Sequence, residues 1–271
     1  MQYRTYPPSN FLSKYIRYYW TLEKEIQTES INKERIFPDG CMELVFHYGD
    51  LFKKYSGDFK SRQQPRSFIH GQLKRYIDVE PTGKIGVFSI RFLPGGLQPF
   101  LKMDVADLTE KEASVEDIWG WAGILLEEKI MEAPTSSVRI KIVEDFLQQQ
   151  MATSVERFLP IDYCVHSILH SRGSASIQSM SNEINLGRRQ LERRFTASVG
   201  LSPKLLMRIV RFQNTLHHID KKAMDSLTGI AYANGFYDQS HFIKDFKEFT
   251  GNNPRKYFNV DLELAKYLTS S

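Results

Sequence analysis

The stretch "GRRQLERRFTASVGLSP", residues 187–203, carries four arginines within seven positions, interleaved with Leu191 and Phe195. Leu191 and Phe195 are four positions apart, so on a helix they share one face while Arg189 and Arg193 point to the other. Such a helix either has an ordinary solvated charged face or packs into a domain and presents its arginines to a polyanion. Because guanidinium groups bind phosphate and read guanine in the major groove, the second interpretation predicts contact with nucleic acid.

The same apolar pattern returns 51 residues further along the chain. Four residues of the first copy and their counterparts in the second share this shift: Leu191, Phe195, Gly200 and Pro203, and Phe242, Phe246, Gly251 and Pro254. Upstream, "SIQSMS" matches "SLTGIA" at a shift of 50, so the second copy has one extra residue in its turn. Each copy predicts a short helix, a turn and a longer helix ended by glycine, which is the helix-turn-helix layout.

The second copy buries a different set of apolar residues and exposes a different polar set. Phe242, Phe246 and Phe249 fall on its inner face at helical spacing. Its outward and flanking residues are Gln239, Ser240, His241, Lys244 and Lys247. Lysine and arginine can address guanine, glutamine can address adenine, and a recognition helix usually reads bases with its amino-terminal half. Two similar scaffolds with different polar faces are what reading two different half-sites requires.

A connecting segment, "PKLLMRIVRFQNTLHHID", lies between the two copies and is long enough for a helix of about 16 residues, or ~24 Å. Successive major-groove faces on one side of DNA are ~34 Å apart, so this connector can hold two reading units at comparable separation. Its apolar stripe favours rigid packing: Leu205, Ile209, Phe212 and Leu216. Its basic residues either contact phosphates or are merely solvated: Lys204, Arg208 and Arg211.

The charge of the chain is unevenly distributed. The 271 residues carry a net charge of +4, and their number suggests two domains. Residues 160–258 hold 14 lysines and arginines against 8 aspartates and glutamates, a balance of +6, whereas residues 1–159 hold 21 against 22. A basic domain joined to a near-neutral one is typical of nucleic-acid binding.

The cysteines and the apolar segments indicate where the protein works. Cys41 and Cys164 are the only cysteines and lie far apart, which suggests separate domains and no disulfide framework. The first ten residues lack the apolar stretch of a signal peptide, and the chain has no apolar run long enough for a membrane span. We expect a cytoplasmic protein without a membrane segment.

The chain divides into a sheet-rich and a helical part. Residues 1–100 predict several short strands with turns at "FPDG", "YSGD", "EPTG" and "LPGG", typical of a small barrel or sandwich. Residues 101–155 predict helices that complete an amino-terminal sensory or dimerisation domain, 1–155, and the domains join within 149–160. Residues 160–271 predict an all-helical domain with two helix-turn-helix motifs. The expected fold class is therefore α+β with two domains.

The quoted segments together with "GFYDQSHFIKDFKEFTGNNPRKYF" resemble the DNA-binding domain of the arabinose-operon regulator (AraC/XylS) family over residues 165–258. The resemblance implies a bacterial transcription regulator with two helix-turn-helix units bound to one face of double-stranded DNA. It implies these base-contacting residues: Arg189, Glu192, Arg193, Gln239, Ser240, His241 and Lys244. Backbone phosphates would be contacted by Arg188, Arg194, Lys204, Arg208, Arg211, Lys247 and Lys256.

The amino-terminal segments "IFPDGCMELVFHYGD" and "RFLPGGLQPFL" resemble more loosely the cupin-like companion domain of some family members, which senses a small molecule, dimerises or both. The pattern departs from a metal-binding cupin, which needs a His-x-His pair, because His47 and His70 are isolated, with Cys41 and Glu43 near the first. We therefore expect no metal, no other cofactor and no catalytic residue.

Four residues on the predicted strands are candidates for an effector pocket: Trp20, Phe46, Phe88 and Arg91. The alternative for the apolar members is simple barrel core, whereas a buried Arg91 would want an anionic partner. The dimer surface and the ligand pocket stay open as alternative roles for this domain.

Two other functional classes compete with a regulator. A DNA-repair alkyltransferase with the same DNA-binding module needs a four-cysteine zinc site, which two distant cysteines cannot build. An RNA-binding or other interaction module is the third class, but RNA readers usually expose aromatic residues for stacking, and here the aromatics fall on inward positions.

Overall fold

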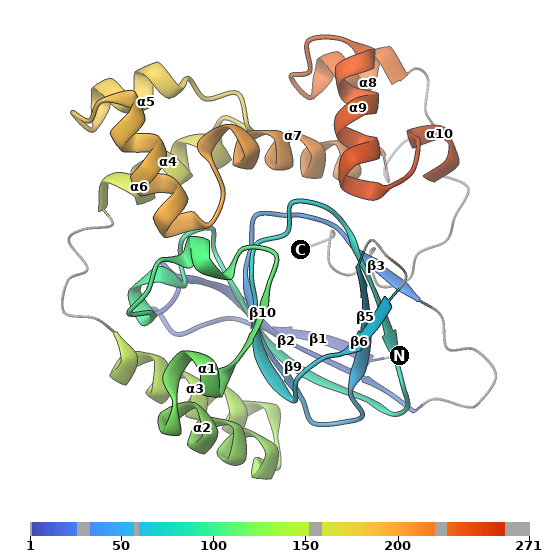
Figure 1. The fold of residues 1–271 in the computed structure, drawn as a ribbon, viewed down its shortest axis with the longest axis vertical. Helices are drawn as coiled ribbons and strands as arrows, with labels where there is room; N and C mark the ends of the chain where they lie inside the picture. Colours follow the sequence, from blue (N-terminus) through green and yellow to red (C-terminus); the bar gives the residue numbers. More distant parts are fainter. Residues whose placement is uncertain (1, 26–32, 57–59, 152–158, 220–226, 258–271) are drawn as a thin grey trace.

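The computed structural model describes residues 2–25, 33–56, 60–151, 159–219 and 227–257. A sheet-rich part is followed by a helical part that lies across one end of it (Figure 1). Within the described residues, no helix is long and apolar enough to cross a membrane. The expected α+β class is confirmed.

Two antiparallel sheets enclose one core and form the amino-terminal part, the barrel. The first has the strand order β1 (Gln2–Tyr6), β2 (Ile16–Lys24), β9 (Ile85–Phe92), β4 (Glu43–His47), β7 (Ser67–His70) and β10 (Glu112–Ser114). The second has the order β3 (Glu34–Ile36), β8 (Ile77–Pro81), β5 (Phe52–Ser56) and β6 (Lys60–Gln63). The predicted end of the sheet-rich region at residue 100 is too early, because β10 pairs with β7. A three-residue edge strand carries too little alternation to stand out in a sequence.

The first sheet is buried on both faces. One face meets the second sheet around a core that includes Trp20, Val45 and Val87. The other face packs under α1 (Val115–Trp119), α2 (Trp121–Glu132) and α3 (Ser136–Gln150), whose apolar residues join Phe46 and Phe88 (Figure 1). The 3-10 helices η1 (Gln98–Phe100) and η2 (Val105–Leu108) connect β9 to β10. All eight residues of β9 are buried, because successive side chains enter the two cores alternately.

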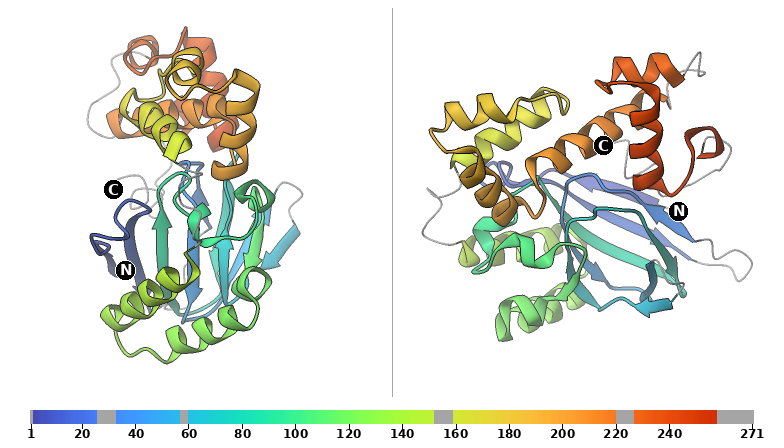
Figure 2. Two further views of the ribbon diagram at one scale, coloured as in Figure 1. Left: turned by 90° about the vertical axis from the view of Figure 1, so that its left-hand side faces the viewer. Right: turned by 45° about the horizontal axis from the view of Figure 1, so that its top comes forward.

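The carboxyl-terminal part is helical throughout its described residues. Its helices are α4 (Leu159–His170), α5 (Ile177–Glu183), α6 (Arg188–Val199), α7 (Pro203–Ile219), α8 (Leu227–Ala233), α9 (Gln239–Thr250) and α10 (Pro254–Tyr257). The 17-residue α7 runs between α5–α6 and α8–α9, as the connector predicts (Figures 1 and 2). Most of the predicted join, 149–160, lies outside the described residues.

The helical part rests on one end of the sheets through a few specific contacts. Gln213 on α7 donates to the carbonyl of Pro38 at 2.7 Å, and Thr109 donates to the carbonyl of Gly200 at 2.7 Å. Phe37, which follows β3, inserts into the core of the helical part, with its ring centroid 6.1 Å from that of Phe212. The segment after β3 therefore belongs to both parts.

Candidate DNA-binding surface and barrel cavity

The first helix-turn-helix unit consists of α5 and α6. Ser176 caps α5 by accepting from the Ser179 N–H, and four residues separate the two helices. Leu191 and Phe195 are fully buried against the other helices, whereas the four arginines of α6 are exposed. Gly200 ends α6 in the left-handed conformation with φ 81°, which glycine adopts without strain.

The second unit, α8 and α9, repeats this construction with different caps. Five residues separate its helices, one more than in the first unit, as the 50-residue upstream shift predicts. Asp238 caps α9 by accepting from the His241 N–H at 2.7 Å, and Gly251 ends it with φ 74°. Phe242, Phe246 and Phe249 are fully buried. The paired apolar skeletons of the two units are therefore confirmed.

The carboxyl ends of α6 and α9 both contact the barrel. Gly200, after α6, accepts from Thr109, and Thr250, at the end of α9, accepts from Arg35 at 2.9 Å. The amino-terminal turns of α6 and α9 thus lie at the far ends of helices whose other ends are held by the barrel (Figure 2). The positive end of the α6 dipole has no side-chain cap and is available to anions, whereas the Asp238 carboxylate already caps the positive end of α9.

The exposed polar side chains of the two helices differ. Arg188 donates to Glu192 at 3.3 Å on α6, an exposed pair that contributes little to stability. On α9, Ser240, Lys244 and Lys247 are exposed. Gln239 and His241 are half-buried, and Gln239 accepts from Thr228 at 2.9 Å, which holds its amide in place.

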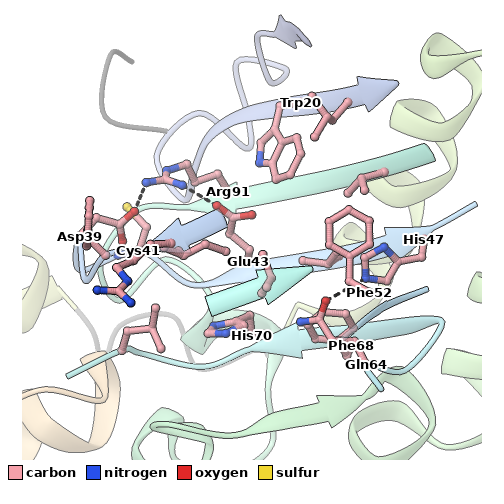
Figure 3. Close-up of a pocket in the computed structure, with 18 of the residues that line it drawn as sticks. Trp20, Asp39, Cys41, Glu43, His47, Phe52, Gln64, Phe68, His70 and Arg91 are labelled. Atoms are coloured by element: carbon pink, nitrogen blue, oxygen red, sulfur yellow. Dashed lines mark hydrogen bonds and ion pairs between the residues drawn. The ribbon is translucent and has the colours of Figure 1, made fainter. Parts of the chain in front are cut away.

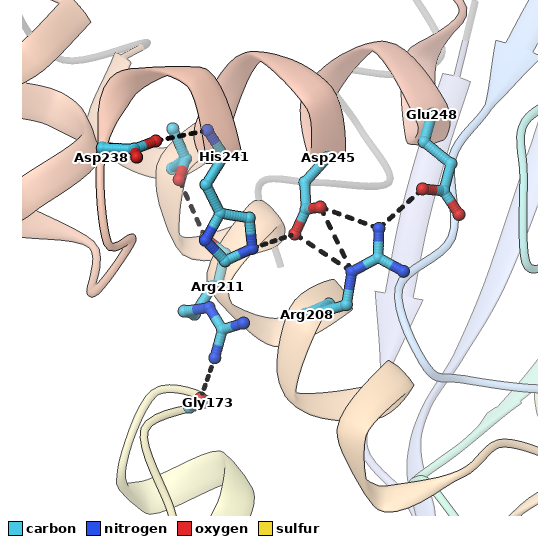
Figure 4. A network of polar contacts seen from close by, with 8 residues as sticks. Gly173, Arg208, Arg211, Asp238, His241, Asp245 and Glu248 are labelled. Carbon is cyan, nitrogen blue, oxygen red and sulfur yellow. Dashed lines mark hydrogen bonds and ion pairs between the residues drawn. The ribbon is translucent and has the colours of Figure 1, made fainter.

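An ion-pair network joins α7 to α9. The Arg208 guanidinium lies 2.8 Å from the buried carboxylate of Asp245 and 2.7 Å from Glu248 (Figure 4). These two carboxylates raise the pKa of Arg208 above its ordinary value. His241 Nε2 lies 3.5 Å from the same Asp245. The network fixes the angle between the connector and the second reading helix.

A cavity of about 110 Å³ lies between the two sheets. Apolar side chains from both sheets form most of its wall: Leu22, Val45, Phe52, Phe68, Val79 and Val87. Figure 3 shows Asp39, Cys41, Glu43 and Arg91 gathered at one side of it and His47 and Gln64 at the other. Gln213 of α7 also lines the cavity, so its polar end borders the helical part.

Arg91 is the centre of the polar end. Its guanidinium binds Glu43 at 2.5 Å and also binds Asp39, and its side chain is only 4% exposed. Asp39 also accepts from the Cys41 N–H at 2.7 Å. Burial lowers the pKa of Arg91 and raises the pKa of Glu43 to about 7, and the hydrogen bond from Ser89 partly opposes the rise for Glu43. The hydrogen-bonded ion pairs of Arg91 with Glu43 and Asp39 must therefore offset a substantial desolvation cost.

The opposite end of the cavity is neutral. His47 Nε2 lies 3.3 Å from Gln64 Oε1, and Gln64 donates to Glu112 at 2.7 Å. Burial lowers the pKa of both His47 and His70 to about 4, so both are uncharged near neutral pH. Within the described residues, no group of three or more histidine, cysteine or acidic side chains is arranged to hold a metal ion.

Each half of the chain matches a separate family of known domains. Residues 4–114 match a domain of unknown function, DUF6597, and residues 180–259 match a helix-turn-helix domain. A stretch of 82 residues is 37% identical to the HTH-type transcriptional regulator MtrA of Neisseria gonorrhoeae and covers 30% of this chain. The match spans only 27% of that relative's length.

The carboxyl-terminal part is a helix-turn-helix domain of the AraC type.

Two solved structures align with this chain at low similarity. ToxT from Vibrio cholerae aligns with 11% identity and a TM-score of 0.46, covering 96% of this chain and 98% of that one. CdpR from Pseudomonas aeruginosa aligns with 15% identity and a TM-score of 0.33, covering 66% and 46%. At these TM-scores neither alignment indicates a function for this chain.

Two of the basic residues predicted to contact phosphates have partners inside the AraC-type domain. Arg208 is bound to Asp245 and Glu248, and Arg211 donates to the carbonyl of Gly173 at 2.6 Å, with burial lowering its pKa (Figure 4). Both guanidinium groups tie α7 to its neighbours, and their contact with DNA phosphates stays a prediction. Lys204 is exposed, and the side chain of Lys256 lies outside the described residues.

The four predicted effector residues divide into two pairs. Trp20 and Arg91 line the cavity, whereas Phe46 and Phe88 are fully buried beneath α1–α3 on the opposite face of the sheet. The prediction for Phe46 and Phe88 is wrong, because Phe88 and Arg91 are three positions apart on one strand and must face opposite sides. The anionic partners expected for Arg91 are the protein's own.

Sequence reasoning missed Asp39 as a functional residue and considered Glu43 only as a metal ligand. The available signal was the string "FPDGCME", which places two carboxylates at the turn beside the first sheet. The cysteines follow expectation: Cys41 lines the cavity and Cys164 is buried in the helical core.

Proposed function

We propose that this protein is a sequence-specific DNA-binding transcription regulator whose amino-terminal domain, residues 1–155, binds a small-molecule effector. The observation that supports DNA recognition is the pair of helix-turn-helix units with matching buried skeletons and different exposed residues on α6 and α9. The cavity that borders α7 supports the effector role. The proposal assigns no catalytic step to the chain.

In this proposal polar side chains of α6 and α9, exposed or half-buried, read bases. The base-contacting set is Arg189, Glu192, Arg193, Gln239, Ser240, His241 and Lys244. Exposed basic residues beside it contact the backbone phosphates: Arg188, Arg194, Lys204 and Lys247. Arg188 and Lys204 line a groove between the two units, where a phosphate backbone could cross.

Selection of bound duplexes from a random pool tests the proposal. A single enriched motif with two half-sites, one per unit, is expected, and equal retention of all sequences at fixed salt would refute sequence-specific reading. Matched variants then separate the roles. Arg193→Ala should cost about 1–3 kcal/mol on the preferred site and relax one base position, whereas Arg194→Ala should weaken all duplexes alike and reduce the salt slope by about 1.

Homodimerisation is proposed through α2. Trp121 is 69% exposed, and Leu125 lies four positions later on the same helical face. An exposed apolar pair of this kind is typical of an interface. Sedimentation of Trp121→Ala against the unaltered chain tests it, and identical sedimentation of both proteins would remove this surface.

A further inference from the structure

Four charged side chains line the barrel cavity: Arg35, Asp39, Glu43 and Arg91. Of the four, Arg35 is compensated by Asp78, which it binds through two hydrogen bonds at 2.7 and 2.9 Å. That leaves the single guanidinium of Arg91 facing the carboxylates of Asp39 and Glu43. The polar end of the cavity therefore carries one more negative than positive charge when both carboxylates are ionised.

The other polar groups of the cavity do not supply the missing positive charge. His47 and His70 are neutral because burial lowers their pKa to about 4, and burial raises the pKa of the Cys41 thiol to about 11, so it stays protonated. Lys54 is bound to Glu112 at 3.2 Å and does not line the cavity. Arg17 acts on Arg91 and on the Cys41 thiol from the outside of the barrel, where its side chain is exposed and solvent screens its charge.

Glu43 is the carboxylate with the greater need of a partner. It shares Arg91 with Asp39, and Asp39 lies at the mouth, where its side chain is 22% exposed. The Glu43 side chain is 16% exposed, slightly less than that of Asp39, and burial raises its pKa because it disfavours the charged carboxylate. A cation that entered the cavity beside Glu43 would relieve this cost.

The remaining wall suits an apolar body with a cationic end. The indole of Trp20 lines the cavity on the side of Glu43, and tryptophan is the best aromatic partner for a cation (Figure 3). Further from Arg91, Phe52 and Phe68 offer apolar surface. A cavity of about 110 Å³ is close to the ~150 Å³ that holds a benzene molecule. At the far end, His47 Nδ1 is buried without a partner among the described residues.

We propose that the cavity binds a small primary amine whose ammonium group contacts Glu43 and Asp39 and whose single ring or short chain fills the apolar wall. The inference deepens the proposed effector role of the same cavity. A carboxylate ligand is disfavoured, because it would be the third anion around one guanidinium.

Calorimetric titration of the full chain with three probes of one size tests the proposal. Benzylamine is the cation, benzyl alcohol the neutral analogue and benzoate the anion. Benzylamine should bind at least about tenfold more tightly than benzyl alcohol, and benzoate should bind most weakly. Equal affinity for amine and alcohol, tighter binding of benzoate, or no saturable binding of any probe would overturn the proposal.

Two substitutions locate the ammonium group. Glu43→Gln should weaken benzylamine at least about tenfold while changing benzyl alcohol by less than about twofold. The matched control is Glu144→Gln, which makes the same charge change outside the cavity, where Glu144 accepts from Tyr19 and Ser9. If Glu43→Gln does not fold by circular dichroism, Asp39→Asn replaces it, with a smaller loss of the same sign. Benzylamine affinity unchanged in the folded variant would refute the site.

Because the titrations contain no DNA, their failure leaves DNA recognition standing. Duplex selection on the same preparations reports on DNA recognition alone. The two outcomes therefore separate the ligand proposal from the proposed function.

Discussion

Replacing Phe37 by alanine should weaken the attachment of the helix-turn-helix domain to the barrel. Phe37 comes from the barrel part, but its ring packs against Phe212 and Tyr257 of the helical part and is 5% exposed. Removing a buried phenylalanine ring costs about 4 kcal/mol in lost apolar burial and cavity formation. The loss should fall on the helical core, because the ring's aromatic contacts are there.

The placement of tryptophan makes this loss measurable. All three tryptophans, Trp20, Trp119 and Trp121, lie in the amino-terminal part, so their fluorescence reports its unfolding. Far-UV circular dichroism is weighted toward helices and reports mainly the carboxyl-terminal part. In Phe37→Ala the dichroism midpoint should fall by about 2 M urea, ahead of the fluorescence midpoint, for an m-value near 2 kcal/mol/M.

Phe11→Ala is the matched control, because Phe11 is 49% exposed and its loss should cost less than about 0.5 kcal/mol. A Phe37→Ala midpoint no lower than that of Phe11→Ala would show that the ring does not hold the two parts together. An equal fall of both signals would show that the two parts unfold as one unit and would contradict the prediction that the loss falls on the helical core.

Three further predictions concern stability. Arg208→Met should destabilise the helical domain by about 3 kcal/mol in urea unfolding, because the buried Asp245 loses its guanidinium partner and keeps only His241 beside it. Adding Asp245→Asn should recover part of the loss, and no recovery would show that the ion pair is not the cause. Between pH 6.5 and 4 the unfolded chain protonates at His47 while the folded chain does not, so the free energy of unfolding falls as pH falls. The His47→Gln variant should lose about 3 kcal/mol less over this range. A pH profile identical to that of the unaltered chain would refute this role of His47. Gly251→Ala should lower the free energy of unfolding by at least about 2 kcal/mol, because φ is 74° and a Cβ would lie 2.4 Å from the Tyr76 ring. Gly187→Ala, with open space around the added Cβ, should cost only a few tenths of a kcal/mol. Similar thermal midpoints for the two variants would refute the close approach at Gly251.

The helix-turn-helix units could be predicted from the sequence because their information is local. The apolar residues of each unit repeat at the helical period: Leu191 and Phe195 in the first, Phe242 and Phe246 in the second. Each helix ends at a glycine, which adopts the left-handed conformation there. The extra residue in the second turn was also readable, since it appears as a change of shift between the copies. Short-range periodicity in the sequence is enough to predict such elements.

The fate of individual charges could not be predicted in the same way. Arg208 and Arg193 look alike in the sequence, yet Arg208 meets Asp245 and Glu248 across two helices, whereas Arg193 stays exposed. The partners of Arg208 are 37 and 40 residues away, and only the packing of α7 against α9 brings them into contact.

The same distinction separates the two halves of the protein. Sequence alone determined the duplicated reading units, the basic carboxyl-terminal part and the sheet-rich amino-terminal part, because composition and spacing carry that information. Only the tertiary structure decided which face of β9 meets the cavity, because a strand buried on both sides shows no polar alternation to reveal its inner face. It also decided that Arg91 shares its charge with Asp39 and Glu43, since β4, β9 and the turn before β4 meet only in the folded chain.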